Sequence, residues 1–301
     1  MRLLSTLSLI SALLLTGCLA EEDKSVTNEQ GEDVNDVTAA LNGFWDGVLN
    51  AGATSEANMR VLIYNGNLYG LDENNGYYGT LVLNPDDETA IAALTSYALS
   101  TDSEADAEMF IANGSEAEVD LDVQQASIAA TNDSLFGSFS IDGTASGNIE
   151  MTREDTWTDN APLSKLTGTG KWTATGYEMV ISSSSQGTTF TGVATDESGC
   201  KFSGFITTED PDYNLYNVNM RQRSDCPDFN EDSVNGYAGF NLAGELEFYL
   251  RKGSQLLFMT FTPPVSAGSG TDTGTDTGTD TGTGTDTGTD TGTDTGTETA
   301  V

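Results

Sequence analysis

Residues 246–261 read LEFYLRKGSQLLFMTF and contain the pattern that decides the fold class of this chain. Leu246, Phe248 and Leu250 alternate with polar or amphipathic residues, and a second apolar set follows shortly after them. Side chains of a β-strand point to opposite faces in turn, so this period of two predicts strands with one buried and one wet face. The same alternation recurs at residues 59–63, 119–123 and 216–220.

Short dipeptides between the strand patterns predict tight turns. Asn-Gly and Asp-Gly pairs accept the positive φ angles that two-residue hairpin loops require. Strands joined by such loops run antiparallel, so we expect an all-β chain of antiparallel strands. The four predicted turns are Asn65-Gly66, Asn75-Gly76, Asp142-Gly143 and Asn235-Gly236.

The strand patterns form two similar series, each opened by a Gly-x-Trp tripeptide, Gly43-Phe44-Trp45 and Gly170-Lys171-Trp172. Each series has the size at which an antiparallel sheet of about eight strands closes on itself. We therefore expect two tandem small barrel-like units, residues 41–153 and 167–263, with a connector at residues 154–166. One larger β-sandwich or barrel is the alternative.

One stretch of the first unit fits two structures. Residues 87–100, DETAIAALTSYALS, have an acidic start and an Ala-rich interior, which suit a helix. The same residues also suit a pair of strands with a small bend. The sequence leaves both interpretations open.

The N-terminal residues predict export and lipid attachment. Arg2 precedes an apolar run that ends in Leu15-Thr16-Gly17-Cys18. A positive start, a short apolar stretch and small residues before the cut are typical of a secretory signal peptide. The Cys after Thr-Gly resembles the bacterial lipobox, whose thiol is acylated. We therefore expect residues 1–17 to be a lipoprotein signal peptide and Cys18 to carry the lipid.

The segments outside the strand series predict how the protein is held. No other segment is apolar for long enough to cross a bilayer, so the lipid is the expected membrane contact. Leu19 follows Cys18 in place of the Asp that commonly retains lipoproteins in the inner membrane, which favours the outer membrane. Residues 18–40 are acidic and polar and predict a flexible tether. Residues 264–301 are Thr-Asp-Thr-Gly repeats and predict a disordered tail.

The charge balance limits the classes of partner. The formal net charge is -36, from 47 acidic and 11 basic residues, which is incompatible with a phosphate-binding surface and hence with nucleic-acid binding. Such an excess keeps a protein solvated, and salt-rich surroundings also select it. The expected contacts are the membrane, through the N-terminal lipid, and a protein partner.

Cysteine and histidine usage bears on both structure and chemistry. With Cys18 acylated, Cys200 and Cys226 remain, and we expect them to form a disulfide in the oxidising envelope. The chain contains no histidine, which removes Ser-His-Asp and Cys-His catalysis and imidazole acid–base chemistry. We therefore predict no enzyme and no catalytic residue, although a pair of carboxylates alone can hydrolyse glycosides.

The closest approach to a metal-binding pattern lies at Asp228, Asn230 and Asp232. These oxygen-bearing residues stand at alternate positions, as they do at the start of an EF-hand-like calcium loop. Ser233 replaces the Gly of the sharp turn, and Gly239 stands where a bidentate Glu would be. The calcium pattern is incomplete, a solvated turn explains it without an ion, and no other cofactor is expected.

The aromatic residues admit two interpretations. Trp45 and Trp172, each within Gly-x-Trp, resemble the entrance strand of lipocalins and small barrel inhibitors, and an apolar ligand would sit inside if either barrel were hollow. In a filled barrel each Trp closes the bottom of the core, which is the interpretation we favour. Tyr213, Tyr216 and Tyr237 would offer a partner-binding surface if they were exposed, although Tyr also suits strands for its own sake.

The second half of the chain resembles a group of uncharacterised proteobacterial envelope lipoproteins in the order of its motifs. Residues 163–172 (LSKLTGTGKW) are similar to their SLAxLAGTW motif, with one extra residue before the Trp. The resemblance implies a small β-rich lipoprotein with a disulfide that bridges a hairpin, and it brings no activity and no site residues. The further matching motifs are GCKFSG at 199–204 (GCxYSG), DPDYNLY at 210–216 (DPxYNxY), Cys226, and NGYAG at 235–239 (NGxYxGL).

These observations together predict a non-enzymatic envelope lipoprotein, a lipid-anchored β-barrel module for protein interaction or envelope structure. A lipocalin-like carrier of a small apolar ligand is the alternative. A hydrolase that uses carboxylates ranks third.

Overall fold

The computed structural model describes residues 26–27, 33–34, 41–50, 56–84, 89–100, 108–124, 134–168, 170–185, 187–226 and 233–264. Within these ranges the regular structure is β-strand, apart from two short 3-10 helices, and every strand pairing is antiparallel. The predicted all-β fold is therefore confirmed. Two short strands near the N-terminus, β1 (Val26–Thr27) and β2 (Asp33–Val34), pair only with each other.

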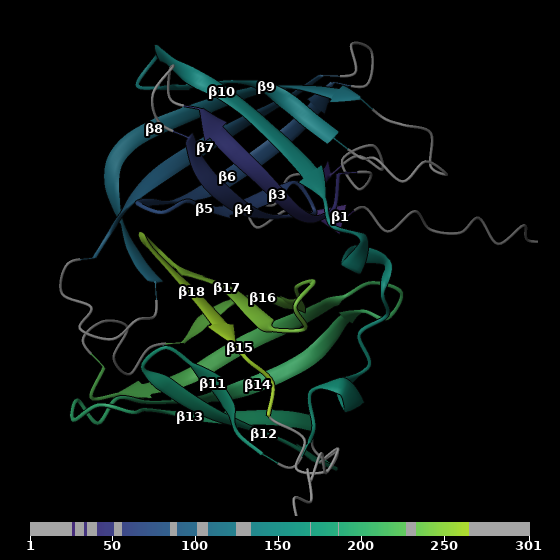
Figure 1. Ribbon diagram of the computed structural model, residues 1–301, viewed down its shortest axis with the longest axis vertical. Helices are drawn as coiled ribbons and strands as arrows, with labels where there is room; N and C mark the ends of the chain where they lie inside the picture. Colours follow the sequence, from purple (N-terminus) through teal and green to yellow (C-terminus); the bar gives the residue numbers. More distant parts are fainter. Residues whose placement is uncertain are drawn as a thin grey trace, which may run out of the picture. The chain divides into compact units, whose positions relative to one another are not determined.

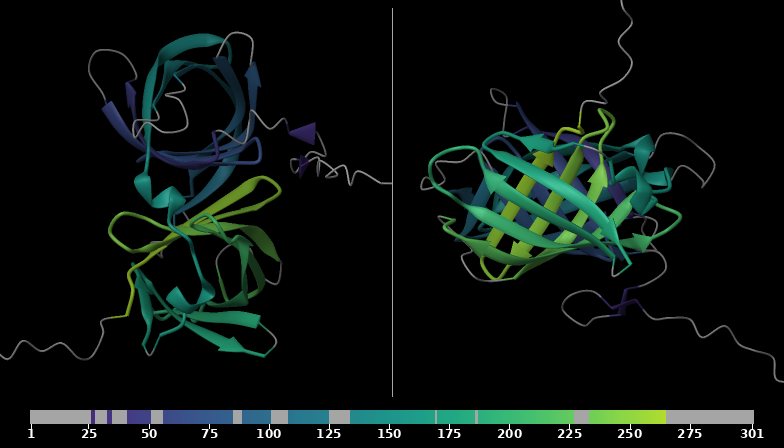
Figure 2. Two further views of the ribbon diagram at one scale, coloured as in Figure 1. Left: turned by 90° about the vertical axis from the view of Figure 1, so that its right-hand side faces the viewer. Right: turned by 90° about the horizontal axis from the view of Figure 1, so that it is seen from below.

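Eight consecutive strands form a closed ring, which we call the first barrel (Figures 1 and 2). Each strand pairs with the next along the chain, except that β10 also returns to β3 and thereby closes the ring. The pairing of β8 with β9 completes the circuit. The strands are β3 (Gly43–Asn50), β4 (Glu56–Tyr64), β5 (Asn67–Leu71), β6 (Asn75–Asn84), β7 (Thr89–Leu99), β8 (Glu108–Gln124), β9 (Ser134–Ile141) and β10 (Thr144–Arg153).

The next eight strands form a second series, which we call the second barrel. Neighbours in sequence pair throughout, and a single bridge between Thr173 and Thr262 joins its two ends. Two backbone hydrogen bonds of 3.0 and 2.7 Å make that bridge. The strands are β11 (Trp172–Ala174), β12 (Tyr177–Ser184), β13 (Gly187–Ala194), β14 (Lys201–Asp210), β15 (Leu215–Ser224), β16 (Val234–Phe240), β17 (Leu246–Lys252) and β18 (Gln255–Phe261).

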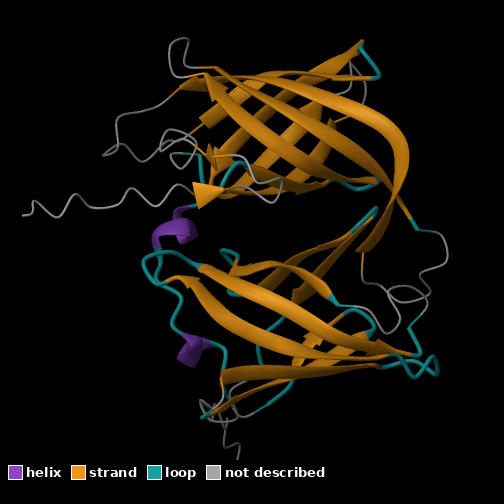
Figure 3. Cartoon of the chain, turned by 180° about the vertical axis from the view of Figure 1, so that it is seen from behind, coloured by secondary structure: helices purple, strands orange, loops and turns teal. Residues whose placement is uncertain are grey.

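The two barrels are parts of one continuous sheet. The long strand β8 pairs with β9 through residues 117–124, and its beginning, residues 108–111, pairs with β18. Gly114, between these two halves, has a φ of 83°, a value that glycine adopts readily. The chain passes between the barrels through the 3-10 helices η1 (Asp155–Thr158) and η2 (Leu163–Lys165), drawn in purple in Figure 3.

Two of the four predicted turns are confirmed, and two are wrong. Asn65-Gly66 and Asp142-Gly143 have positive φ at both residues, as a type I′ hairpin loop requires. Asn75-Gly76 instead begins β6, and Asn235-Gly236 lies within β16. An added Cβ at Gly236 would lie 2.0 Å from the backbone oxygen of Tyr249, so this glycine permits close packing of strands. Sequence alone does not distinguish that role from a turn.

The stretch that fitted two structures forms a single strand. Residues 89–99 are β7, which pairs with β6 on one side and with β8 on the other. Its small residues Ala90 and Ala92 point into the core of the first barrel and are fully covered. The Ala-rich composition therefore fits a crowded barrel interior, and it overrides the helical propensity of these residues.

Three hydrophobic clusters hold the sheet together. One fills the first barrel and one the second, and each contains the Trp that opens its series, Trp45 and Trp172 respectively. The third cluster joins residues of both barrels, including Phe44, Trp157 and Tyr249. The outward faces of several strands are consequently buried against the other barrel.

Candidate functional site

The disulfide predicted from the cysteine count is present. Cys200 and Cys226 are bonded, with their Cα atoms 4.4 Å apart, just before β14 and just after β15. Lys201 pairs with Ser224 beside the bond, so the disulfide fastens the open end of this hairpin. Both cysteines are buried in the core of the second barrel, which agrees with a structural role.

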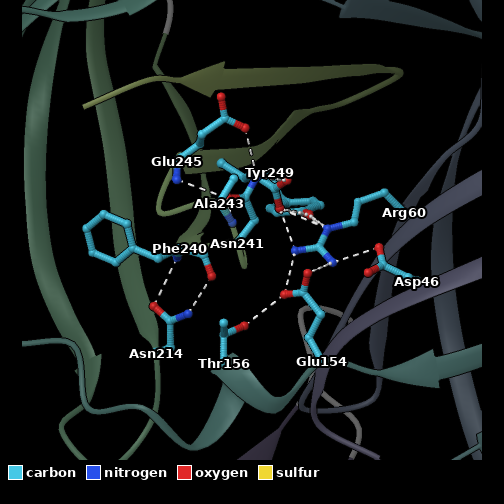
Figure 4. A network of polar contacts seen from close by, with 11 residues as sticks. Asp46, Arg60, Glu154, Thr156, Asn214, Phe240, Asn241, Ala243, Glu245 and Tyr249 are labelled. Atoms are coloured by element: carbon cyan, nitrogen blue, oxygen red, sulfur yellow. Dashed lines mark hydrogen bonds and ion pairs between the residues drawn. The ribbon is translucent and has the colours of Figure 1, made fainter. Parts of the chain in front are cut away.

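The most concentrated polar site is a cluster around Arg60 of β4, shown in Figure 4. The Nη1 atom of Arg60 lies 2.9 Å from Oδ1 of Asp46 and 2.8 Å from Oε1 of Glu154. The Nη2 atom donates to Oε2 of Glu154 at 3.0 Å and to Oε2 of Glu247 at 2.8 Å. The Nε atom donates to the same Glu247 oxygen at 2.9 Å and to the Tyr249 hydroxyl at 3.1 Å. This Arg60 cluster joins β4 of the first barrel to β17 of the second.

The cluster is largely buried. The Arg60 side chain is 15% exposed and that of Glu154 only 5%, whereas Asp46 is 58% exposed. Burial by itself lowers the pKa of Arg60, but its interactions with Tyr249, Glu247 and Glu154 outweigh burial and raise the pKa well above the ordinary value. The guanidinium is therefore a permanent positive charge that holds the buried carboxylates.

The carboxylates of Glu154 and Glu247 also accept hydrogen bonds from groups other than Arg60. Thr156 donates its hydroxyl to Glu154 at 2.8 Å, and Tyr249 donates to Glu247 at 2.7 Å. Asn241 donates to the remaining oxygen of Glu247 at 3.1 Å. Burial first, and then the charge of Glu247, raises the pKa of Tyr249 well above the ordinary value, so its hydroxyl remains a donor at neutral pH.

A cavity of about 310 Å³ lies beside the cluster. Its lining includes Arg60 and Leu71 from the first barrel and Glu247 and Thr260 from the second. The volume is at the lower end of the range for ligand pockets, about 300–1,000 Å³. Because Arg60 and Glu247 already bond to each other, they provide no acid–base pair for turnover. The arrangement links β4 of the first barrel to β17 of the second through buried ion pairs.

The predicted tyrosine surface is wrong for two of its three residues. Tyr216 is fully buried in the second barrel, and Tyr237 packs against Tyr64 and Tyr69 with ring centroids 5.1 and 6.0 Å away. Only Tyr213 is substantially exposed, and it stacks on Trp157 at 4.9 Å. Tyr216 belongs to the core of the second barrel, Tyr237 packs against the cluster that joins the two barrels, and Tyr213 covers Trp157 of η1, so the three residues do not form one exposed surface.

The interior of the first barrel is filled. The space enclosed by its lining residues is about 20 Å³, room for about one water molecule. Trp45 is 1% exposed, and its indole nitrogen donates to the carbonyl of Leu41 at 3.1 Å. Trp172 repeats this arrangement in the second barrel, with a bond of 3.3 Å to the carbonyl of Leu166. Both Trp residues therefore occupy core positions, as favoured from the sequence.

Several predicted site residues lie outside the described residues. These are the lipidation residue Cys18 and the calcium candidates Asp228, Asn230 and Asp232. In the described ranges, no group of three or more acidic or Cys side chains is arranged to hold a metal ion. No helix of the described part has the length and hydropathy needed to cross a membrane.

Sequence reasoning missed the Arg60 cluster. The alternation in residues 59–63 and 246–250 puts Arg60, Glu247 and Tyr249 on the faces that we expected to be wet. The faces are not wet, however, because the other barrel covers them. One signal was available: Arg60 is the only basic residue between Lys24 and Arg153 in a strongly acidic chain.

We compared the chain with protein families, curated proteins and solved structures. No protein-family model matches the chain, and no curated protein and no solved structure matches it significantly. Its function must therefore be inferred from the residues and the geometry described above.

Proposed function

We propose that this chain is a non-enzymatic lipoprotein of the outer membrane, anchored by a lipid on Cys18, whose barrels serve protein interaction or envelope structure. The observation that carries the proposal is the filled interior of the first barrel, where about 20 Å³ remains. With so little internal space, the first barrel offers a partner its outer surface. The lipobox-like residues 15–18 support the anchor, and Leu19 supports the outer membrane.

The chemistry of the buried polar groups supports a non-enzymatic role. The chain lacks histidine, and the two buried carboxylates of the junction, Glu154 and Glu247, are both bonded to Arg60. A general acid or base must be able to exchange its proton with a substrate, which a carboxylate held by a guanidinium does poorly. A catalytic pair of carboxylates therefore gains no support at the junction.

The alternative, a lipocalin-like carrier, finds no room in the first barrel. Ligand pockets usually enclose at least about 300 Å³. Native mass spectrometry of protein purified from its own cells tests this point. We expect only the mass of the acylated chain, and a stoichiometric apolar ligand in addition would favour the carrier.

The anchor is tested by maturation and membrane fractionation in a Gram-negative host. Globomycin treatment or Cys18→Ala should block processing at residue 18, and Cys18→Ala should also prevent incorporation of labelled palmitate. Leu19→Asp is the matched variant: it keeps the acylated Cys but should move the protein from the outer to the inner membrane. Unchanged maturation and fractionation of the Cys18→Ala variant would overturn the proposal.

A further inference from the structure

One row of side chains on the outer wall of the first barrel alternates between acidic and apolar residues. Asp122 of β8 pairs with Phe136 of β9, which pairs with Glu150 of β10, which pairs with Val48 of β3. These strands are neighbours in the closed ring (Figure 1). Adjacent strands lie about 4.8 Å apart, so the Phe136 ring has a carboxylate residue on each side. We call these four residues the Phe136 row.

The row borders a groove and is open to solvent. The groove has a volume of about 630 Å³, and its lining includes Asp46, Val48, Phe136 and Glu150. Phe136 is 36% exposed, and Asp122 and Glu150 are exposed as well. A large aromatic side chain is thus presented in a concave place between two charged groups, where its exposure carries a solvation cost.

Within the described residues, the strands that form this row provide no cation for it. Residues 61–152 contain no Lys, Arg or His, although acidic residues recur throughout them. The two arginines that flank this segment are engaged elsewhere, Arg60 in its cluster and Arg153 over the ring of Trp45 at 4.7 Å. In the described part of the chain, Asp122 and Glu150 form no ion pair.

The second barrel shows how the chain covers such a ring when it has a cation to do so. Phe205 points outward from β14, and the guanidinium of Arg221 on β15 lies over its ring, 4.4 Å from the centroid. The same arginine donates to Oδ1 of Asn219 at 3.1 Å. Phe205 is directly paired with Thr189 and Asn219, and Arg221 reaches its ring from two positions further along β15. Phe136 is directly paired with Asp122 and Glu150 instead, and in the described residues no guanidinium lies over its ring.

We infer that the Phe136 row is a docking site for an arginine-bearing segment of a partner protein. A guanidinium stacked on the Phe136 ring gains a cation–π contact, and its fork of N–H groups reaches the carboxylates of Asp122 and Glu150. The alkyl part of the arginine then covers Val48. The groove exceeds the size of one guanidinium, so it also accommodates the neighbouring residues of the partner segment. This inference deepens the proposed interaction role, but its test does not involve the lipid, so failure of one leaves the other standing.

The test measures binding of a synthetic amidated Arg-Thr repeat peptide to the full mature chain at physiological salt. The matched peptide carries neutral citrulline in place of Arg. The row variant is Asp122→Asn/Phe136→Leu/Glu150→Gln, and the charge-matched control is Glu116→Gln/Glu118→Gln, which removes two carboxylates from the same strand, β8. We expect the row variant to lose about tenfold in affinity, from one cation–π contact and two exposed ion pairs. The affinity of the control for the peptide should fall by no more than about twofold, because the control changes only the net negative charge of the protein.

Four outcomes would overturn the inference. Equal losses of affinity in the row variant and the control would show that the peptide binds through the net charge of the protein alone. Equal binding of the citrulline peptide would exclude a role for the cation. Competition by spermidine at the affinity of the peptide would make the occupant a small polyamine. A dimer in sedimentation that the row variant abolishes would make the occupant a second copy of the chain. Circular dichroism of each variant shows whether it is folded, and because all substituted side chains are exposed, unfolding is not expected.

Discussion

Replacement of Arg60 by methionine should destabilise the junction of the barrels strongly. Methionine keeps an unbranched apolar stem but removes the guanidinium that lies within 3.0 Å of three carboxylates. Glu154 and Glu247 then remain close together with no counter-charge, at side-chain exposures of 5% and 13%. An unpaired buried charge is costly because desolvation is no longer offset by an opposite charge.

The magnitude follows from the burial of each partner. Removing one partner of a buried ion pair costs about 3–5 kcal/mol. Asp46 is 58% exposed, so its loss of Arg60 adds at most about 1 kcal/mol. The total loss is therefore about 3–6 kcal/mol. For a folded body of about 200 residues, each kcal/mol lowers the melting temperature by about 2–4 °C, which gives a decrease of roughly 6–24 °C for Arg60→Met.

The assay is urea and thermal unfolding of the full mature chain, followed by circular dichroism. Adding Glu154→Gln/Glu247→Gln to Arg60→Met should recover at least half of the loss, since neutral amides need no counter-charge. Asp46→Asn alone should change the free energy of unfolding by less than about 1 kcal/mol. The reasoning is refuted if Arg60→Met lies within about 1 kcal/mol of the unchanged protein, or if neutralising both glutamates restores nothing.

Three further predictions concern the stability of the barrels. Replacing Cys200 and Cys226 together by Ala should lower the free energy of unfolding by about 3 kcal/mol, and a urea titration that shows less than about 1 kcal/mol would contradict the structural role of the bond. Gly236→Ala places a Cβ 2.0 Å from the Tyr249 carbonyl oxygen and should lower the free energy of unfolding by about 2–3 kcal/mol. Gly168 has open space around it, so Gly168→Ala should change the free energy of unfolding by less than about 1 kcal/mol. Equal melting temperatures of the two variants would be inconsistent with this packing. The free energy of unfolding should fall as the pH rises above about 10. Burial raises the pKa of several tyrosines, so above this pH the folded state binds more protons than the unfolded state. A free energy of unfolding that stays constant between about pH 8 and 11, while tyrosinate absorbance grows, would contradict this prediction. The tyrosines concerned are Tyr64, Tyr77, Tyr216 and Tyr249.

The local features of the fold could be predicted to the extent that they depend on neighbouring residues. The alternation in residues 246–261 gave both strands, β17 and β18, because a period of two follows from strand geometry. The structural role of an Asn-Gly dipeptide could not be predicted from neighbouring residues, because the lack of a side chain permits a turn at Gly66 and close packing of strands at Gly236. Which role applies depends on a strand that lies far away in the sequence.

The all-strand class, the antiparallel pairing and the Cys200–Cys226 bond follow from periodicity, turn composition and the count of cysteines, which are properties of the unfolded chain. Which polar faces meet water depends on contacts between strands that are far apart in the sequence. Arg60 bonds to Glu247 across 187 positions of sequence, a contact that exists because β18 pairs with β8 and places the outward face of one barrel against the other. Because that face is buried, Arg60 lies at the centre of a charged cluster. The Phe136 row lies on another part of the first barrel and is exposed to solvent.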